Sequence, residues 1–560
     1  MNPDVTALAD QLVALRFEQE PLEAAMLGLA PGSSGLGDAS RASEDRFIGA
    51  YRAIATAADA LVDALGHDGT VLSERDVLTL DVVQYAALAA ADQLGVRQVD
   101  FTISDFFNSP VAGLVSVLPQ LPLDTHERRT QYLERLSLLP RFLRQVSTRH
   151  REGVASGLTP THHGVQTAMA FVDTVLNDEA VSGLRREVDD VEFLAAQDRL
   201  LREEVLPALR DYRDGVDDNV RPHARDDDHA GLCWLARGEE MYRTLVRVST
   251  STDRAPQELH ETGLALIEDL RADFATIGER LWGLSDVSEI HDRLRNDPAL
   301  RYHDGDEILE AALTTVRRAE VAAPEWFGVV PSTPCAVQPV PPALADGSAS
   351  AYYFAGALDG SRPGTYFINT VRPEDRLRHT AEAIAFHEAV PGHHFQLTIA
   401  QEVEDSHVVH TVFTDVANAE GWGLYAERLA DEMGLYSGDV ALLGMLSTDA
   451  FRAARLVVDT GLHALGWSRQ RAIDWMSANV PLSSVEIVSE VDRYISMPGQ
   501  ALSYMVGRLE IQDCRRMASE ALADRFDVRA FHDLVLSTGP VPLPSLRAAV
   551  QRWVVSSTSA

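Results

Sequence analysis

Apolar residues recur at helical spacing through most of the chain, and this periodicity constrains the fold more than any other feature. The pattern begins with Leu8, Leu12 and Leu15, whose spacing places them on one face of a helix. It continues in long stretches around residues 41–66, 73–95, 127–153, 163–215 and 256–283. The sequence therefore predicts a mainly α-helical protein whose N-terminal half is nearly all helix. Residues 214–230 are dense in charge and poor in apolar side chains, so we expect a surface excursion there.

The composition changes between residues 324 and 370, where prolines and β-prone aromatic residues gather. The segment AYYFAGALDGSRPGTYFINT, residues 351–370, predicts two short strands joined by turns at Asp359–Gly360 and Pro363–Gly364. We expect a small antiparallel β-sheet that forms a wall of a cleft, and helices again from about residue 374. The sequence thus predicts a large two-lobed helical body with a deep cleft. Residues 1–320 would form the N-terminal helical lobe and residues 321–560 the second lobe of one continuous body.

The charge balance and the residue types exclude several classes of function. The 560 residues include 84 acidic and 49 basic side chains, for a formal net charge of -35, so we expect no nucleic-acid partner. All 49 basic residues are Arg, because the sequence contains no Lys. The chain therefore has no Walker-type phosphate loop, no Schiff-base lysine and no Ser-Lys dyad. It also lacks the GxSxG and GxGxxG patterns of serine hydrolases and dinucleotide-binding proteins.

Features that report on cellular location point to the cytoplasm. Cys233, Cys335 and Cys514 are far apart, so neither a disulfide framework nor a thiolate zinc site is expected. The first 20 residues carry acidic side chains where a signal peptide has a basic region and an apolar run. No stretch approaches 18 consecutive apolar residues, so we also expect no membrane partner.

The segment HEAVPGHH, residues 387–394, is the main candidate for chemistry. His387 and Glu388 begin like the zinc-protease pattern H-E-x-x-H, in which two imidazoles one helical turn apart bind zinc and the Glu acts as general base. Pro391 stands where the second His of that pattern belongs. The strict pattern is therefore broken, and the second ligand has to be sought further along the chain.

His393 and His394 are the two candidates for the second ligand. On an ideal helix His394 would lie ~20° off the face of His387 but ~10.5 Å along the axis, and His393 would lie ~120° off that face. A regular helix is not expected here, because Pro391 removes a hydrogen bond and Gly392 permits unusual dihedral angles. A kink or bulge would bring either histidine to a zinc ion shared with His387.

The third metal ligand is expected on a following helix. The best candidate is Glu420, which shares one helical face with Leu424 and Glu427, so that its carboxylate can project towards a neighbouring helix. Two imidazoles and one carboxylate leave a fourth position for water, which is typical of catalytic rather than structural zinc sites.

Four motifs together carry a resemblance to a known family. They are HEAVPGHH, EGWGLYAE from residue 420, RLVVDTGLHALGW (455–467) and YISMPGQALSYMVG (494–507). In this order they resemble the bacterial family called domain of unknown function 885. Its members are grouped with helical gluzincin metallopeptidases and resemble, more distantly, thimet oligopeptidase and angiotensin-converting enzyme. The resemblance is strong from about residue 320 to 560, which would be the metallopeptidase-like lobe.

The gluzincin resemblance implies a third-ligand Glu some two dozen residues after the second His. Glu420 follows His394 by 26 residues and His393 by 27, which supports Glu420. The Gly-His pair at residues 392–393 also resembles the thimet-type pattern H-E-x-G-H and favours His393, whereas helical face geometry favours His394.

These residues predict a zinc-dependent hydrolase, a metallopeptidase that cleaves short peptides with metal-activated water. Zn²⁺ would be held by His387, His393 and Glu420, with His394 as the alternative to His393. Glu388 would take the proton of the water and later pass it to the leaving amine.

Two residues are candidates for stabilising the developing oxyanion. Tyr504 follows a plausible helix start at Pro498–Gly499, which would direct the first turn towards the cleft. His463 stands four residues after Asp459, a spacing at which the carboxylate can orient the imidazole.

Three residues are candidates for binding substrate. Tyr366 and Asn369 belong to the strand 365–370, and an exposed edge there would hold an extended peptide by main-chain hydrogen bonds. Arg508, like Arg455, suits a substrate carboxylate, although structural ion pairs are the alternative interpretation.

Two other functions stay open at this point. The chain would be a non-catalytic ligand-binding protein if Pro391 marks a degenerate metal site. It would be a metal-dependent amidase or esterase if the substrate is a small metabolite, because zinc-hydroxide chemistry is shared and the pocket sets the substrate. The sequence does not indicate an oligomeric state.

Overall fold

Helices dominate the computed structural model, which describes residues 1–27, 35–67, 72–177, 183–341, 345, 349–357, 362–404 and 406–559. The structure is 73% helix, which confirms the predicted mainly α fold. The turn predicted at Asp359–Gly360 lies outside the described residues.

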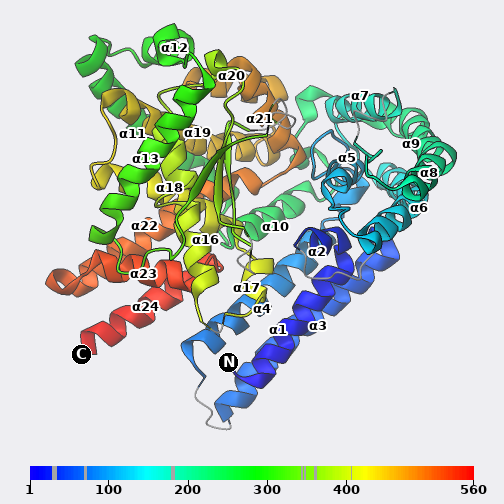
Figure 1. The fold of residues 1–560 in the computed structure, drawn as a ribbon, viewed down its shortest axis with the longest axis horizontal. Helices are drawn as coiled ribbons and strands as arrows, with labels where there is room; N and C mark the ends of the chain where they lie inside the picture. Colours follow the sequence, from blue (N-terminus) through cyan, green and yellow to red (C-terminus); the bar gives the residue numbers. More distant parts are fainter. Residues whose placement is uncertain are drawn as a thin grey trace.

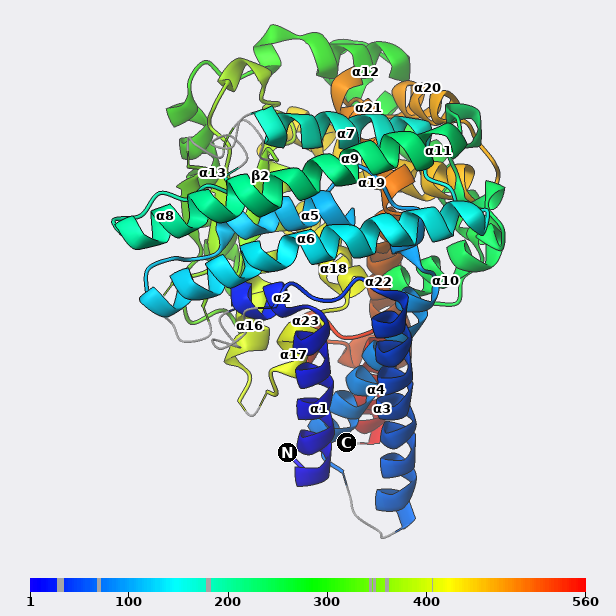
Figure 2. The same ribbon diagram turned by 90° about the vertical axis from the view of Figure 1, so that its right-hand side faces the viewer.

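The helices of the first half form two groups and a connecting series. The first group is blue in Figure 1 and contains α1 (Pro3–Gln19), α3 (Arg41–His67) and α4 (Glu74–Gly95), which project from the body in Figure 2. The short α2 (Pro21–Leu27) lies across the end of α1 next to the body. The second group packs side by side in Figure 2: α5 (Pro110–Val117), α6 (His126–Ala155), α7 (His162–Asn177), α8 (Val191–Leu200) and α9 (Leu206–Asn219). The series that follows is α10 (Gly238–Thr250), α11 (Pro256–Trp282), α12 (Val287–Asn296) and α13 (Gly305–Ala322).

The charged segment 214–230 is more regular than predicted. Helix α9 continues to Asn219, and two short 3-10 turns follow at Arg221–His223 and Asp227–His229. The helix persists because Val216 is buried against the apolar side chains of α6 and α7. Val216, with Val220 at the helix end, therefore keeps one face covered within a highly charged stretch.

A small three-stranded sheet interrupts the helices, with strands β1 (Ala336–Pro339), β2 (Ala351–Phe354) and β3 (Thr365–Ile368) in the order β1-β3-β2. The predicted antiparallel pair is β2 and β3, in which Tyr353 pairs with Tyr366. Strand β1 was not predicted, and it runs parallel to β3. The sheet is therefore mixed rather than purely antiparallel.

The C-terminal helices complete the fold. They are α15 (Ala381–Glu388), α16 (His393–Glu402), α17 (Val409–Val412), α18 (Val416–Glu432), α19 (Asp439–His463), α20 (Arg469–Asn479), α21 (Ser484–Ser496), α22 (Ser503–Leu522), α23 (Val528–Thr538) and α24 (Leu543–Ser559). Helices α18 and α22 cross closely, since Gly421 and Gly507 leave no room for a side chain between the two backbones. This crossing fixes the position of α18 against α22.

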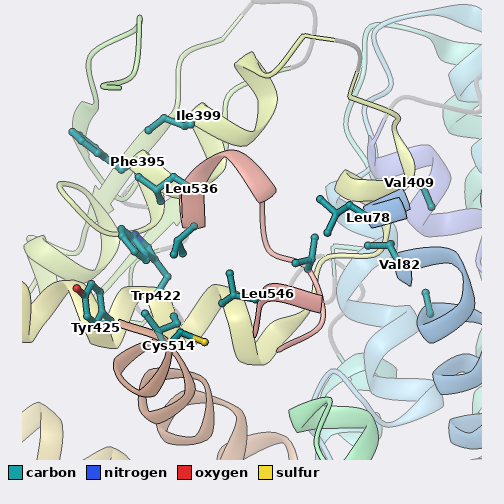
Figure 3. Packing of buried hydrophobic residues seen from close by; sticks show 14 of the residues in the cluster. Leu78, Val82, Phe395, Ile399, Val409, Trp422, Tyr425, Cys514, Leu536 and Leu546 are labelled. Atoms are coloured by element: carbon teal, nitrogen blue, oxygen red, sulfur yellow. The ribbon is translucent and has the colours of Figure 1, made fainter. Parts of the chain in front are cut away.

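Buried apolar residues form three clusters. One joins α1, α3 and α4 to the sheet and to α16, α18 and α22–α24, and Figure 3 shows part of it around Phe395, Trp422 and Leu546. A second joins α10–α12 to α18–α22, and the third lies within α5–α9. Trp422 belongs to the first cluster and Leu424 to the second, so α18 lies between them. The first two clusters combine side chains from both sides of residue 320, and the division there, like the deep cleft, stays a prediction.

Candidate metal centre

The chain turns sharply between the two halves of the HEAVPGHH motif. Helix α15 ends at Glu388 and α16 begins at His393, which confirms the predicted interruption around Pro391. A Cβ on Gly392 would collide with the carbonyl oxygen of His387, so only glycine allows the chain to fold back this closely. The indole N–H of Trp422 donates to the Pro391 carbonyl at 2.9 Å and ties the turn to α18.

Three side chains converge as a result. The possible ligand atoms of His387, His393 and Glu420 all lie within 4.8 Å of one another. A Glu420 carboxylate oxygen is 3.4 Å from Nε2 of His387 and 3.6 Å from Nε2 of His393. The two imidazole rings are nearly perpendicular, at 86°, with their centroids 4.7 Å apart. Two imidazoles and a carboxylate form a donor set that suits Zn²⁺.

The charges of this group stabilise one another. Burial opposes the charged form of His387, but the carboxylates of Glu420 and Glu427 outweigh it and raise its pKa to about 9. Burial also opposes the charged form of Glu420, yet contacts with both histidines hold its pKa well below its usual range. This group of residues therefore favours an anionic Glu420 carboxylate facing positive charge, whether that charge comes from protons or from a cation.

Glu427 lies behind His387 and was not predicted as part of the site. Its carboxylate is 2.8 Å from Nδ1 of His387, only 1% of the residue is exposed, and the hydroxyl of Thr448 donates to its other oxygen. A carboxylate on Nδ1 holds that nitrogen as the donor and leaves Nε2 free for a metal. The sequence contains a signal for this role, because Glu427 lies seven residues after Glu420 on the same face of α18.

Helix α18 also supplies the surface against which the His387 ring lies. A Cβ on Gly423 would be 2.6 Å from Cε1 and 2.7 Å from Nε2 of His387. The ring therefore packs directly on the backbone of α18. The helix begins at Val416, where the Asp415 side chain accepts a hydrogen bond from the Asn418 N–H at 2.8 Å.

His394 points away from this group. Its Nδ1 is 3.0 Å from the hydroxyl of Tyr353, and its Nε2 is 3.0 Å from the Thr333 carbonyl oxygen. Burial lowers its pKa to about 4, so it is a neutral structural residue. The alternative assignment of His394 as the second ligand is therefore wrong, because the break at residues 389–392 rotates α16 away from the helical projection that favoured it.

Glu388 lies between the convergent histidines and the sheet. Its carboxylate accepts a hydrogen bond of 2.9 Å from the backbone N–H of Tyr353, on the edge strand β2. Sequence reasoning assigned the exposed edge to the strand containing Tyr366, but that strand is β3 and is central. The unpredicted β1 occupies its outer side, so the proposed peptide-binding edge at 365–370 is wrong.

The other predicted substrate-binding residues have structural partners or are buried. The Asn369 side chain donates to the Ala345 carbonyl and accepts from the Val371 N–H, and Arg508 forms a buried ion pair with Asp449. These contacts contradict a substrate-binding role for Asn369 and Arg508. Tyr366 is fully buried, and its hydroxyl has no hydrogen-bond partner within the described part of the chain. Tyr366 is therefore not on an exposed binding surface, and burial, followed by the charge of Glu388, raises the pKa of its hydroxyl.

The two predicted oxyanion donors have different surroundings. Burial, followed by the negative charge of Glu420, raises the pKa of Tyr504, so its hydroxyl stays protonated near the candidate metal ligands. His463 is fully buried, with Nδ1 accepting from the Leu232 N–H and Nε2 donating to the Tyr494 carbonyl. Both of its nitrogens are thus used within the fold. The predicted pairing of His463 with Asp459 is wrong, because that carboxylate instead accepts from Tyr242 and Gly499.

Solved structures share this fold. One from Colwellia psychrerythraea, described as a "putative lipoprotein", has a TM-score of 0.88 and 25% identity over 99% of both chains. Another from Shewanella oneidensis, described as a "putative lipoprotein of unknown function", has a TM-score of 0.79 and 18% identity over 97% of this chain and 99% of its own. A carboxypeptidase from Pyrococcus furiosus reaches only 0.33 at 13% identity over 91% of this chain and 98% of its own, too low to indicate a shared fold. No curated protein matches significantly.

The predicted cytoplasmic location is contradicted, because the solved structure that is 25% identical over 99% of both chains is described as a putative lipoprotein. The cysteine pattern and the acidic N-terminal segment did not indicate this. Among the described helices, none combines the length and the apolar character needed to cross a membrane.

The family comparison agrees with the four motifs. The family described as "Bacterial protein of unknown function (DUF885)" matches residues 21–550, which is nearly the whole chain. The further relationship to gluzincin peptidases stays a prediction. The chain belongs to the DUF885 family.

Proposed function

We propose that the chain is a zinc-dependent hydrolase of peptide bonds, with His387, His393 and Glu420 as metal ligands and Glu388 as general base. The observation that carries this proposal is the convergence of the three donor atoms within 4.8 Å, although they come from three different helices. A buried imidazole that meets two further potential ligands and is oriented by a second carboxylate is typical of a metal site rather than of an ordinary surface. The Glu427–His387 contact of 2.8 Å is that orienting interaction.

The residues around the convergence point have complementary roles in such a reaction. A zinc ion in a donor set of two imidazoles and a carboxylate supplies Lewis-acid chemistry and makes water nucleophilic at neutral pH. Glu388, adjacent to the ligand His387, accepts the proton of the attacking water and passes it to the leaving amine. The β2 backbone holds the Glu388 carboxylate in place through the Tyr353 N–H. Tyr504, which remains protonated, donates to the developing oxyanion.

Short peptides are the substrate class that this arrangement favours. The edge strand β2 runs beside Glu388, so main-chain groups are available next to the general base. Hydrolysis of an amide or ester of a small metabolite would use the same chemistry. Turnover of members of a peptide library distinguishes a peptidase from an enzyme that acts on such metabolites. The description of the 25% identical Colwellia protein as a lipoprotein supports peptides outside the cytoplasm as substrates.

Elemental analysis combined with peptide turnover tests the proposal. The unsubstituted protein should contain about one zinc per chain, and His387→Ala and Glu420→Ala should lose it. His394→Ala is the matched control, because it removes a neighbouring imidazole that points away, and it should keep the zinc. Glu388→Gln should also keep the metal but lose at least about 100-fold in kcat.

Two results would contradict this assignment. Full turnover by Glu388→Gln would exclude Glu388 as the general base. The absence of bound zinc in the unsubstituted protein, even after zinc is added, would favour a non-catalytic ligand-binding protein.

A further inference from the structure

Arg455 is a buried arginine with unused hydrogen-bonding capacity. Its side chain is 6% exposed, Nε donates to the Tyr494 hydroxyl at 3.1 Å, and Nη2 donates to Glu490 at 3.2 Å. The third nitrogen, Nη1, is buried and has no hydrogen-bond partner among the described residues. The guanidinium carbon lies 4.1 Å from the ring centroid of Phe451 and 4.3 Å from that of Tyr504. These contacts fix the orientation of the guanidinium and leave one corner of its fork without a partner.

Arg452, Arg455 and Arg493 have Glu490 as their one ion-pair partner within 4.0 Å among the described residues, and the buried Asp459 acts on Arg493 from farther away. Arg455 and Arg493 share Glu490 as their carboxylate partner. Arg452, one turn before Arg455 on α19, has no carboxylate within 4.0 Å in the described part of the chain, and its Nε is buried without a partner. A local surplus of arginine is notable in a chain with a net charge of -35. Such a surplus is expected where an anionic ligand completes the charge balance.

The arginine group lies close to the candidate metal centre along two structural connections. On α19, Thr448 donates to Glu427 behind His387, and Arg455 follows seven residues later, about 10 Å along the same face. On α22, Tyr504 contacts the Arg455 guanidinium and lies one turn before Gly507, where α22 touches α18. The charge of Glu420 also acts on Tyr504. Tyr504 is thus the residue between the metal-binding group and the arginines.

We propose that Arg455, assisted by Arg452, binds the C-terminal carboxylate of a peptide substrate, so that the protein removes residues from the C-terminal end. This inference rests on the proposed hydrolase function. A guanidinium fork binds a carboxylate through charge-assisted hydrogen bonds, and here its aromatic neighbours hold it in place before the substrate arrives. Tyr504 connects Arg455 to the candidate metal ligands, so cleavage is expected close to the C-terminus.

The structure favours Arg455 over Arg508 for this role. Both arginines share one carboxylate with a second arginine, Asp449 for Arg508 and Glu490 for Arg455, and each has one buried nitrogen without a partner among the described residues. Arg455 differs because its guanidinium carbon lies 4.3 Å from the ring centroid of Tyr504, the residue on which the charge of Glu420 acts.

A binding experiment tests the proposal without depending on turnover. The probes are N-acetyl-trialanine and the same peptide with a C-terminal amide, titrated calorimetrically into zinc-loaded Glu388→Gln protein. The free carboxylate should bind at least about 10-fold more tightly than the amide, as expected for a charge-assisted hydrogen bond. Arg455→Gln in the same background should reduce this difference to less than about 2-fold. Arg149→Gln is the matched control, because Arg149 is equally buried but pairs with Asp100 and Glu44 in the N-terminal half, and it should keep the full difference.

Equal affinity for the two peptides, failure of the free-acid peptide to bind, or an undiminished difference in Arg455→Gln would overturn the inference. If Arg455→Gln does not fold, the inference is tested by comparing the affinities of the free-acid and amidated peptides for the Glu388→Gln protein alone. The unsubstituted enzyme separates this inference from the proposed function. Cleavage of amidated peptides at internal bonds would refute recognition of the C-terminal carboxylate but would be consistent with the proposed hydrolase function. Preferential binding of the free-acid peptide by a protein that contains no zinc and has no turnover would refute the hydrolase function but would be consistent with the arginine site.

Discussion

Replacing Gly423 with Ala tests directly whether the His387 ring is held by the backbone of α18. The added Cβ would lie 2.6 Å from Cε1, 2.7 Å from Nε2 and 2.9 Å from Nδ1 of the ring. Carbon atoms in contact prefer separations of about 3.5–4.0 Å, so the ring or the helix has to move by about 1 Å. The helix has little freedom to move, because Gly421 on the same helix is already in backbone contact with Gly507 of α22. We therefore expect the imidazole to be displaced.

The size of the effect differs between stability and metal binding. In the metal-free protein, Ala stabilises a helix interior by about 0.5–1 kcal/mol relative to Gly, whereas overpacking costs about 1–3 kcal/mol. The gain offsets only part of the cost, and the free energy of unfolding should fall by at most about 2.5 kcal/mol. Displacing the ring also disturbs its 2.8 Å contact with Glu427. Losing such support behind a ligand weakens metal binding about 10- to 100-fold, or about 1.4–2.8 kcal/mol.

Zinc competition against a chelator of known affinity measures this loss, and chemical denaturation measures stability. Gly215→Ala is the matched control, because Gly215 lies within α9 and a Cβ there meets nothing within 4 Å. The control should gain about 0.5–1 kcal/mol of stability and bind zinc unchanged. If Gly423→Ala behaved like this control in both assays, the ring would not be packed on α18 and the reasoning would be refuted.

Three further predictions follow from contacts around α18 and α19. Glu427→Gln keeps the side-chain shape but removes the negative charge behind His387. Zinc affinity, measured in the same competition assay, should therefore fall about 10- to 100-fold. Unchanged zinc affinity would contradict the role of Glu427 in orienting His387. Gly507→Ala would drive a methyl group into the carbonyl oxygen of Ala417, and denaturation should show a loss of at least about 3 kcal/mol. Burial raises the pKa of Asp459 to about 7 from its ordinary 3.8. Because the folded state disfavours the charged carboxylate, the free energy of unfolding should fall as the pH rises from about 4 to 7. Asp459→Asn should lessen that fall. If the free energy of unfolding depended equally on pH in both proteins, the raised pKa of Asp459 would be contradicted.

The helices were predictable from sequence because their apolar faces recur at a local period that tertiary contacts only reinforce. Strand β1 was not predictable from sequence, because its residues Ala336–Pro339 are flanked by prolines and lack the run of aromatic residues found in β2 and β3. A parallel strand pairs with residues far away in sequence, so its partner leaves no local signal. Missing β1 led to the wrong assignment of β3 as an exposed edge.

The convergence of the candidate metal ligands was predictable in part. His387, Glu388 and Glu420 stand in motifs whose residue types already suit zinc chemistry. The choice between His393 and His394 was not decidable from helical geometry, since the break at residues 389–392 sets the direction of α16. The partners of Arg508 and Asn369 depend on long-range packing and are likewise absent from the local sequence.

The geometry of α18 explains how a site of this type tolerates a broken H-E-x-x-H pattern. In that pattern, one helical turn sets the distance between two histidines. Here α18 sets the geometry instead, because Glu420 faces both histidines, Gly423 seats the His387 ring, and Glu427 orients it. The positions of these three residues repeat at helical spacing, so the rigid element that defines the site is α18 rather than the helix that carries His387. Substitutions that shift α18 against α22 should therefore impair metal binding even when no ligand is changed, which makes the glycine contact between these helices part of the site.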